Sequence, residues 1–233
     1  MKVLYLPRYG PLGASSRVRG YQYLPRLRAA GIDITVSPLL PDAYLQRLYA
    51  GARTHLTELG AAYLRRVAAL LQRTRFDLVW IEYEALPWLP VGFELWALGR
   101  STPYVVDYDD AIFHRYELHP RGWVRRMLGS KIDRVMQHAA LVLCGNDYLA
   151  ARARQAGAQR VEHLPTVIDL ERYPRPDFSE TKEPNPVPVI GWIGSPATTH
   201  YLEHVRTALA QVCASGQARL RLVGARDPHW GDV

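Results

Sequence analysis

The chain carries at residues 103–116 the stretch PYVVDYDDAIFHRY, in which an apolar run ends in a cluster of acids. The two adjacent valines favour a buried strand, whereas Asp107, Asp109 and Asp110 need water, a cation or hydrogen-bond donors around them. We therefore predict a strand over residues 104–107. Polar chemistry is expected to begin where that strand stops.

The composition is typical of a folded domain with a sizeable core. The 233 residues are 48% hydrophobic and 22% charged. No apolar run reaches the roughly 18 residues of a membrane span, and the N-terminus enters a short apolar strand without the pattern of a secretory signal. We expect a cytoplasmic protein. Cys144 and Cys213 lie in or beside apolar runs, which favours buried thiols over a disulfide or a metal site.

Basic residues outnumber acidic ones, with 29 Lys and Arg against 22 Asp and Glu and a net charge of +7. Such an excess attracts anionic partners. Nearly all of it is arginine, whose planar guanidinium suits bidentate contacts with phosphate. The arginines lack a recognisable nucleic-acid-binding module, so we expect a phosphorylated small molecule or a phospholipid surface, and no nucleic acid.

The N-terminus predicts the first half of a βαβ unit. A strand over residues 2–6 and a loop of small residues precede a helix expected over about 17–29, capped by Ser15 or Ser16. The backbone N–H groups of such a loop and the positive helix end can receive an anion, and Gly13 lets the loop approach it closely. An ordinary turn with surface arginines is the alternative.

Further apolar runs predict an α/β fold, a Rossmann-like doubly wound parallel sheet, because strands alternate with amphipathic helices. In such a sheet, ligands collect beyond the carboxyl ends of the strands. Glu82 and Glu84 close one strand there and could act as general bases or bind sugar hydroxyls. The additional strands are expected at 32–36, 77–83, 141–144 and 161–164, and the helices at 43–73 in two pieces interrupted near Gly51, at 91–100 and at 147–156, the last capped by Asn146.

Two basic stretches could face either solvent or a membrane. Residues 114–138 hold arginines and Lys131 among apolar side chains, whose helical spacing indicates one packed side. Trp123 and the arginines near it could touch lipid headgroups, although an ordinary surface helix has the same pattern. In residues 43–73, Arg66 and the other arginines are expected largely off the apolar face.

A proline-rich stretch at residues 174–188 divides the chain. Five prolines mixed with charged residues fit no regular element, so we expect a linker between a domain at 1–173 and a second one at 189–233. So short a second domain cannot bury both faces of a sheet, hence it either extends the first sheet or is truncated. It is predicted to contain strands at 189–193 and 219–223 and a helix at 201–214.

The order of these parts resembles a known family. The segments VVDYDDAIF, VLCGNDYLAARARQAG, VEHLPTVIDLERY and VIGWIGSP follow one another as in the GT4-type (group 1) retaining glycosyltransferases of the GT-B fold. The resemblance implies two Rossmann-like domains, the first holding mainly the acceptor and the second mainly a nucleotide-sugar donor, usually without a required metal. LPTVIDLERY is similar to the family's inter-domain hinge.

The resemblance also implies roles for single residues. The stretch from Gly13 to Arg17, which includes Ser15 and Ser16, would lie near the donor phosphates and the acceptor. Asp109 and Asp110 stand in the place of a histidine and an acid that the family usually has after its mid-domain strand. Gly194, Ser195 and His200 stand roughly where the family offers Arg and Lys to the diphosphate. The family's E-x7-E motif has no counterpart in the sequence.

Asp107, Tyr108 and Asp109 also form an acid-x-acid pattern, which can hold Mg or Mn on a nucleotide diphosphate. The pattern is common, and the two carboxylates share a face only if the strand continues through both. We expect capping and hydroxyl binding instead, with no metal or other cofactor.

The sequence thus predicts a glycosyltransferase that moves a sugar from a nucleotide-sugar donor to a glycan, lipid-linked or small-molecule acceptor. Asp109 is expected to meet the reacting sugar, Asp110 to support it, and Arg17 and Glu82 to bind substrate. If the protein ends at Val233, the alternative is a noncatalytic module that binds a nucleotide, a glycan or an anionic membrane. The basic segment would allow peripheral contact with the inner face of the plasma membrane.

Overall fold

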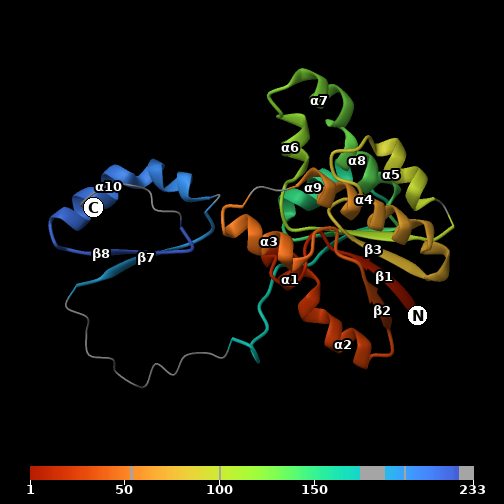
Figure 1. Cartoon of the computed structure of the whole chain (residues 1–233), viewed down its shortest axis with the longest axis horizontal. Coiled ribbons are helices and arrows are strands. Elements are labelled where there is room, and N and C mark those ends of the chain that lie inside the picture. Colours follow the sequence, from red (N-terminus) through yellow and green to blue (C-terminus); the bar gives the residue numbers. More distant parts are fainter. Residues whose placement is uncertain (53–54, 100, 174–186, 197, 226–233) are drawn as a thin grey trace. The chain divides into compact units, whose positions relative to one another are not determined.

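The computed structural model describes residues 1–52, 55–99, 101–173, 187–196 and 198–225 (Figure 1). The chain divides into two compact units, Met1–Tyr173 and Pro174–Val233, which we describe separately. The predicted linker at 174–188 lies outside the described residues, apart from its last two. In the part of the chain so described, no helix is both long and apolar enough to span a bilayer.

The first unit is built on a six-stranded parallel sheet. Its strands are β1 (Lys2–Leu6), β2 (Asp33–Val36), β3 (Leu78–Glu82), β4 (Tyr104–Tyr108), β5 (Leu141–Cys144) and β6 (Val161–His163). They lie in the order β2-β1-β3-β4-β5-β6, so the chain winds outward in both directions from β1 and β3. This arrangement confirms the predicted α/β fold with a doubly wound parallel sheet.

The helices of this unit are α1 (Ala14–Arg19), α2 (Leu24–Ala29), α3 (Asp42–Tyr49), α4 (Leu56–Leu71), α5 (Val91–Leu98), α6 (Phe113–Glu117), α7 (Gly122–Leu128), α8 (Lys131–His138) and α9 (Asp147–Gln155), with short 3₁₀ turns η1 (Tyr21–Tyr23) and η2 (Arg73–Arg75). They cover the sheet unequally. Helices α4, α5, α8 and α9 lie on one face, whereas α2 lies on the other (Figure 1). The predicted basic helix at 114–138 is in fact three short helices, α6 to α8.

Alternation along the strands divides the core into two clusters. Leu4 and Leu6 of β1 face the larger cluster, beneath α4, α5, α8 and α9. Val3 and Tyr5 face the smaller one, beneath α2. There Tyr5 stacks on Trp80 of β3, with 4.2 Å between the ring centroids. Both side-chain sets of a central strand are therefore buried, as a continuous apolar run predicts.

Turn residues end several helices where the sequence predicts. Gly51, between α3 and α4, and Gly157, after α9, have positive φ angles of 74° and 86°, which favour glycine. Asn146 caps α9, because its side-chain oxygen accepts the N–H of Leu149 at 2.9 Å. The predicted break near Gly51 and the predicted Asn146 cap are confirmed.

The first helix differs from its prediction. It begins at Ala14, earlier than expected, and its N-cap is Gly13 with no side-chain cap, so the predicted serine cap is wrong. The hydroxyl of Ser16 turns inward instead. The helix stops at Gly20, where a Cβ would collide with the phenol of Tyr5. The expected single helix is therefore α1, η1 and α2 in succession.

The second unit contains, among the described residues, the parallel strands β7 (Val189–Ile193) and β8 (Arg219–Val223). The 3₁₀ helix η3 (Thr199–Val205) and α10 (Arg206–Ala214) connect them. Both strands match their predicted ranges, whereas the predicted helix begins as a 3₁₀ turn. These strands pair with each other in a sheet of their own.

Candidate functional site

The carboxyl ends of β1, β3 and β4 form a polar edge of the first sheet. Strand β1 has β2 on one side and β3 on the other, so the topology reverses there. In doubly wound sheets, ligands bind at such a switch point. The register of β3 and β4 places Glu82 beside Asp107 at this edge. The acids that the sequence singles out thus lie on neighbouring strands.

Glu82 is buried, with 2% of its surface exposed, and receives only neutral donors. Its Oε2 accepts the hydroxyl of Ser16 at 2.6 Å and the backbone N–H of Arg8 at 2.9 Å. Its Oε1 has no partner among the described residues. Burial raises the pKa of Glu82 to about 7, although the two hydrogen bonds oppose the rise. Glu82 therefore joins β3 to the loop after β1 and can carry a proton at neutral pH.

Asp107 is buried too, but it is paired with Arg19 of α1. Arg19 Nε donates to Oδ2 at 3.0 Å and Nη2 donates to Oδ1, which makes the pair bidentate. Burial raises the pKa of Asp107, and Arg19 opposes the rise. Arg19 Nη1 also donates to the carbonyl of Leu164 at 2.5 Å. This one arginine thus connects α1, β4 and the segment after β6.

A second buried charge cluster lies just beyond β3. The ammonium of Lys131 is 2.7 Å from Glu84 Oε2 and 3.1 Å from Glu94 Oε2. It also donates to the carbonyl of Leu86 at 2.5 Å. The phenol of Tyr116 donates to Glu84 Oε1 at 2.8 Å. Glu84 is therefore an internal structural acid, and does not face an open crevice.

The burial of Lys131 and Arg66 corrects two predictions. Lys131 is not on an exposed basic face, and Arg66 lies on the packed side of α4, each 1% exposed. Arg66 donates to the carbonyls of Pro7 at 2.6 Å and Leu6 at 3.4 Å. Burial lowers the pKa of Arg66 to about 10. Helical spacing by itself places charged side chains at the surface. Here, carbonyls and carboxylates that are distant in sequence bind the two buried cations.

Asp109 and Asp110 follow β4 and reach solvent, Asp109 half-buried and Asp110 exposed. Asp109 Oδ1 accepts the phenolic O–H of Tyr83, and Asp110 Oδ1 accepts the N–H of Ala111 at 2.8 Å. Tyr83 has a φ of 63°, a costly conformation for tyrosine that its surroundings must impose. Burial, with Asp109 adding to it, raises the pKa of Tyr83, so the phenol stays a donor.

The carboxylates of Asp107 and Asp109 bind different partners, Arg19 and Tyr83. Among the residues that the structure describes, no group of three His, Cys, Asp or Glu side chains is placed to hold a metal ion. The acid-x-acid pattern is therefore used for two separate protein contacts.

The loop after β1 lies at the same edge, but its glycine serves packing. A Cβ on Gly13 would lie 2.5 Å from the Cβ of Tyr9. Arg17 Nη1 donates to two loop carbonyls at 3.2 and 3.4 Å, and its buried Nε has no partner in the described part of the chain. Ser15 lies near Tyr83 and opposes the rise in the pKa of that phenol. Substrate contacts of Gly13, Ser15 and Arg17 stay predictions.

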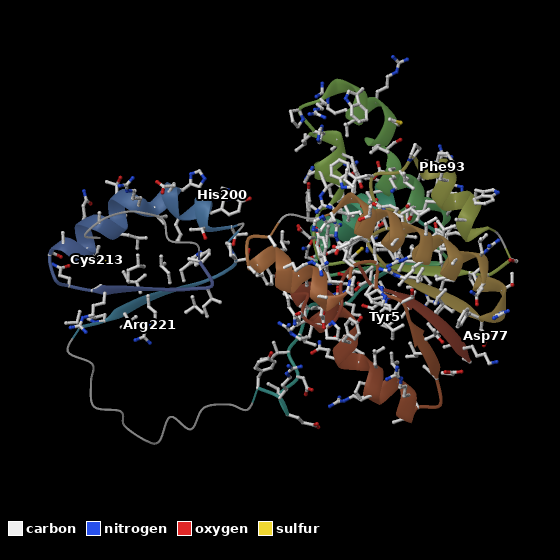
Figure 2. All side chains as sticks on the ribbon, viewed as in Figure 1. Tyr5, Asp77, Phe93, His200, Cys213 and Arg221 are labelled. Atoms are coloured by element: carbon white, nitrogen blue, oxygen red, sulfur yellow. The ribbon has the colours of Figure 1, made fainter. Side chains whose placement is uncertain are left out.

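Gly194, Ser195 and His200 belong to the second unit. Gly194 follows β7, and its N–H donates to the carbonyl of Val223 at 3.0 Å. The N–H of Ser195 donates to Thr198 Oγ1 at 3.0 Å, which forms a tight turn. His200 is exposed on η3, where Figure 2 labels it. Gly194 and Ser195 thus lie in one tight turn after β7. Contact of this turn and of His200 with a donor stays a prediction.

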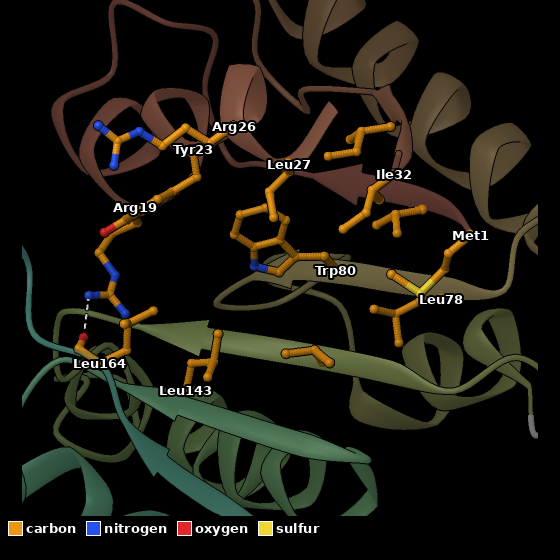
Figure 3. Close-up of a pocket in the computed structure, with 13 residues that line it drawn as sticks. Met1, Arg19, Tyr23, Arg26, Leu27, Ile32, Leu78, Trp80, Leu143 and Leu164 are labelled. Atoms are coloured by element: carbon orange, nitrogen blue, oxygen red, sulfur yellow. Dashed lines mark hydrogen bonds between the residues drawn. The ribbon is translucent and has the colours of Figure 1, made fainter. Parts of the chain in front are cut away.

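An apolar groove of about 390 Å³ lies on the face of the first sheet that α2 covers only in part (Figure 3). Leu27 and Trp80 both line it, Leu27 lying close to the ring of Trp80 in this view. Arg19 lies at one end, where its hydrogen bond to Leu164 is drawn. None of the predicted site residues lines the groove. The polar chemistry is at the edge of the sheet and not in this groove.

Sequence reasoning missed Arg19 and Tyr83 as partners of the aspartates. Ser16 and Arg19 are three residues apart, so a helix beginning at Ala14 would have put both on one buried face. No sequence signal identifies the positive φ of Tyr83, which depends on its surroundings.

Comparison with known proteins gives a family. The family described as "Glycosyl transferase 4-like domain" matches residues 12–167. No curated protein matches the chain. The chain resembles, at 12% identity and a TM-score of 0.47, the structure of Arabidopsis thaliana UGT89C1 complexed with UDP-L-rhamnose, covering 97% of this chain and 69% of that one.

A putative quinone reductase from Klebsiella pneumoniae matches at 16% identity with a TM-score of 0.26, covering 68% of this chain and 82% of that one. The family match covers well over half of the chain and includes the polar edge of the first sheet. The chain therefore belongs to the glycosyl transferase 4-like family.

Proposed function

We propose that the protein transfers a sugar from a nucleotide-sugar donor to a glycan, lipid-linked or small-molecule acceptor. Family membership supports glycosyl transfer in general. The observation that carries the location is Asp109, a partly exposed carboxylate that accepts the phenol of Tyr83 at the polar edge of the sheet, one strand from the topological switch. The transfer is proposed to retain the anomeric configuration, as the resemblance implies.

Asp109 suits an acceptor or transferring sugar. Tyr83 occupies one of its two oxygens, and a carboxylate can accept several hydrogen bonds, so sugar hydroxyls can be added. A carboxylate fixed by a buried phenol loses little further freedom on binding. Asp110 is exposed beside it and supplies a second acceptor. We assign Asp109 to the reacting sugar and Asp110 to its support.

Arg17 suits an anionic group of the donor. Its guanidinium is anchored to the loop after β1 through Nη1, and its side chain is partly exposed. A guanidinium fixed in this way binds phosphate in a defined direction. In the second unit, the turn at Gly194 and Ser195 and the exposed His200 are the proposed donor contacts. We propose that no metal or other cofactor is required.

The test incubates the whole protein with UDP-glucose, UDP-galactose, UDP-N-acetylglucosamine and GDP-mannose. Binding is measured by calorimetry, and release of the nucleoside diphosphate is measured with and without simple sugar acceptors. We expect at least one donor to bind and to be hydrolysed or transferred. Binding without any release would favour a noncatalytic module. No binding and no release with any donor would contradict the proposal.

A further inference from the structure

The α6–α7 tip, which we define as residues 115–127, stands out from the first unit on the crossover from β4 to β5 (Figure 1). We propose that this tip binds the surface of an anionic lipid bilayer. Its arginines meet lipid phosphates, and its exposed apolar side chains enter the headgroup region. The proposal rests on charge and exposure at the tip and is independent of sugar transfer.

Positive charge on the tip is nearly unopposed. All four of its arginines are exposed. The guanidinium groups of Arg115, Arg121 and Arg126 make no hydrogen bond or ion pair with the described residues. The fourth, Arg125, donates to two backbone carbonyls of the tip at 2.6 and 2.9 Å. The one acid, Glu117, is half-buried and is held by Arg152 at 2.7 Å. The tip therefore offers cations to an anionic partner without a competing free carboxylate.

Apolar side chains lie among these arginines. Leu118 is 70% exposed, Trp123 is 58% exposed and Met127 is 49% exposed. Trp123 and Met127 are four residues apart on α7 and so share one side of the helix, next to Arg126. Tryptophan prefers the boundary between membrane and water, because it combines a large apolar ring with a polar N–H. This mixture of exposed arginine and apolar side chains is typical of an interfacial surface.

The packing of the tip uses other residues. Tyr116 and Val124, with Leu128 next to the tip, are at most 2% exposed and fix α6 and α7 to the core. Arg152 also pairs with Asp133 at 2.7 Å, which holds α8 and α9 together beneath. The exposed set is therefore not needed for folding. Changes to it can test binding without disturbing the fold.

Chemistry favours lipid over nucleic acid as the occupant. Nucleic acid is bound by a basic groove that follows the phosphates, or by aromatic rings that stack on bases. Here α7 has only seven residues, and its one exposed ring adjoins Met127, which does not stack on bases. Moving the apolar side chains of Leu118 and Met127 from water into the headgroup region lowers the free energy of binding instead. A bilayer uses both the arginines and the aliphatic side chains.

The test is co-sedimentation of the whole protein with vesicles of phosphatidylcholine containing about one-third phosphatidylglycerol. Vesicles of phosphatidylcholine alone serve as the neutral comparison. We expect binding to the anionic vesicles only, weakened by salt. The double variant Arg121→Glu/Arg126→Glu should bind at least about 25-fold more weakly, because each basic residue near the surface contributes about fivefold and each new carboxylate is repelled. The variant Trp123→Ala/Met127→Ala, with unchanged charge, should also bind more weakly.

The matched control is Arg65→Glu/Arg154→Glu, which makes the same change in charge at exposed positions on α4 and α9. It should bind within about threefold of the parent protein. Circular dichroism melting curves verify that each variant is folded. Absence of binding to anionic vesicles, or equal weakening by the tip and control variants, would overturn the proposal. The proposal would also be overturned if a single-stranded oligonucleotide displaced the protein from vesicles and if the tip variant no longer bound that oligonucleotide.

Discussion

Glu82 and Glu84 lie two residues apart at the end of β3, and both are almost fully buried. Glu84 shares the ammonium of Lys131 with Glu94, whereas Glu82 receives only a hydroxyl and a backbone N–H. A buried carboxylate keeps its charge at low cost only beside a cation. Burial accordingly raises the pKa of Glu82 to about 7. One end of a strand thus holds a structural ion cluster and a group that titrates near neutral pH.

Tyr83 stands between the two acids and has a third task. Its backbone has a positive φ, and its phenol donates to Asp109 and to neither glutamate. Three consecutive residues therefore serve the core, the loop after β1 and the proposed sugar site. This local geometry explains how a buried network can end in one accessible carboxylate.

The largest effect is expected from Lys131→Met. The change leaves Glu84 and Glu94 buried without their cation, which should cost about 3–5 kcal/mol of unfolding free energy. Urea unfolding measures the loss. Lys2→Met removes an exposed lysine and should change stability by less than about 0.5 kcal/mol. Adding Glu84→Gln and Glu94→Gln to Lys131→Met should recover part of the loss. A loss as small as that of the control would refute the ion cluster.

Glu82→Gln should have a smaller effect that depends on pH. Below pH 4.5, the group is protonated in the folded and unfolded states alike. Between pH 4.5 and about 7, the unfolded chain ionises first, so the parent protein loses about 3 kcal/mol of stability that the variant does not lose. Urea unfolding at pH 4 and pH 8 measures the difference between the two proteins. The unfolding free energy of the variant should rise relative to that of the parent protein as pH increases. An equal difference between the two proteins at both pH values would show that Glu82 has an ordinary pKa.

Tyr83→Phe should have the smallest effect on stability, about 1 kcal/mol for one lost hydrogen bond. Because the lost O–H positions Asp109, turnover of the accepted donor should fall about tenfold. The matched control is Tyr63→Phe, which removes a phenol that donates to the carbonyl of Pro87 at 2.6 Å. The control should lose similar stability and keep its turnover. Equal turnover in the two variants would show that Tyr83 does not position Asp109 for the reaction.

Much of the fold follows from the sequence because apolar runs and turn residues act locally. The run at Val105 and Val106 becomes a central strand, and Asn146 caps the helix that it precedes. The start of α1 was less predictable, since the hydroxyl of Ser16 is drawn to Glu82, which lies 66 residues away. A local capping rule cannot include such a distant acceptor.

The candidate site was predictable in place but not in its contacts. Three acids at a strand end indicate the polar edge, and the structure puts Asp109 and Asp110 there. The contacts of Asp107 and Asp109 depend on Arg19 and Tyr83, and the burial of Glu84 depends on Lys131, each far away in sequence from the acid that it binds. Burial of an arginine or a lysine is the exception among surface-type residues, so spacing alone assigns it to solvent.

The most direct test of the account is the turnover of Asp109→Asn with an accepted nucleotide sugar, measured beside its unfolding free energy. The matched control is Asp33→Asn, an exposed aspartate of β2. If Asp109 meets the reacting sugar, the variant should lose at least about 100-fold in turnover, as expected for a group acting in the transition state, and less than about 1 kcal/mol in stability. Turnover equal to that of Asp33→Asn would contradict the central claim.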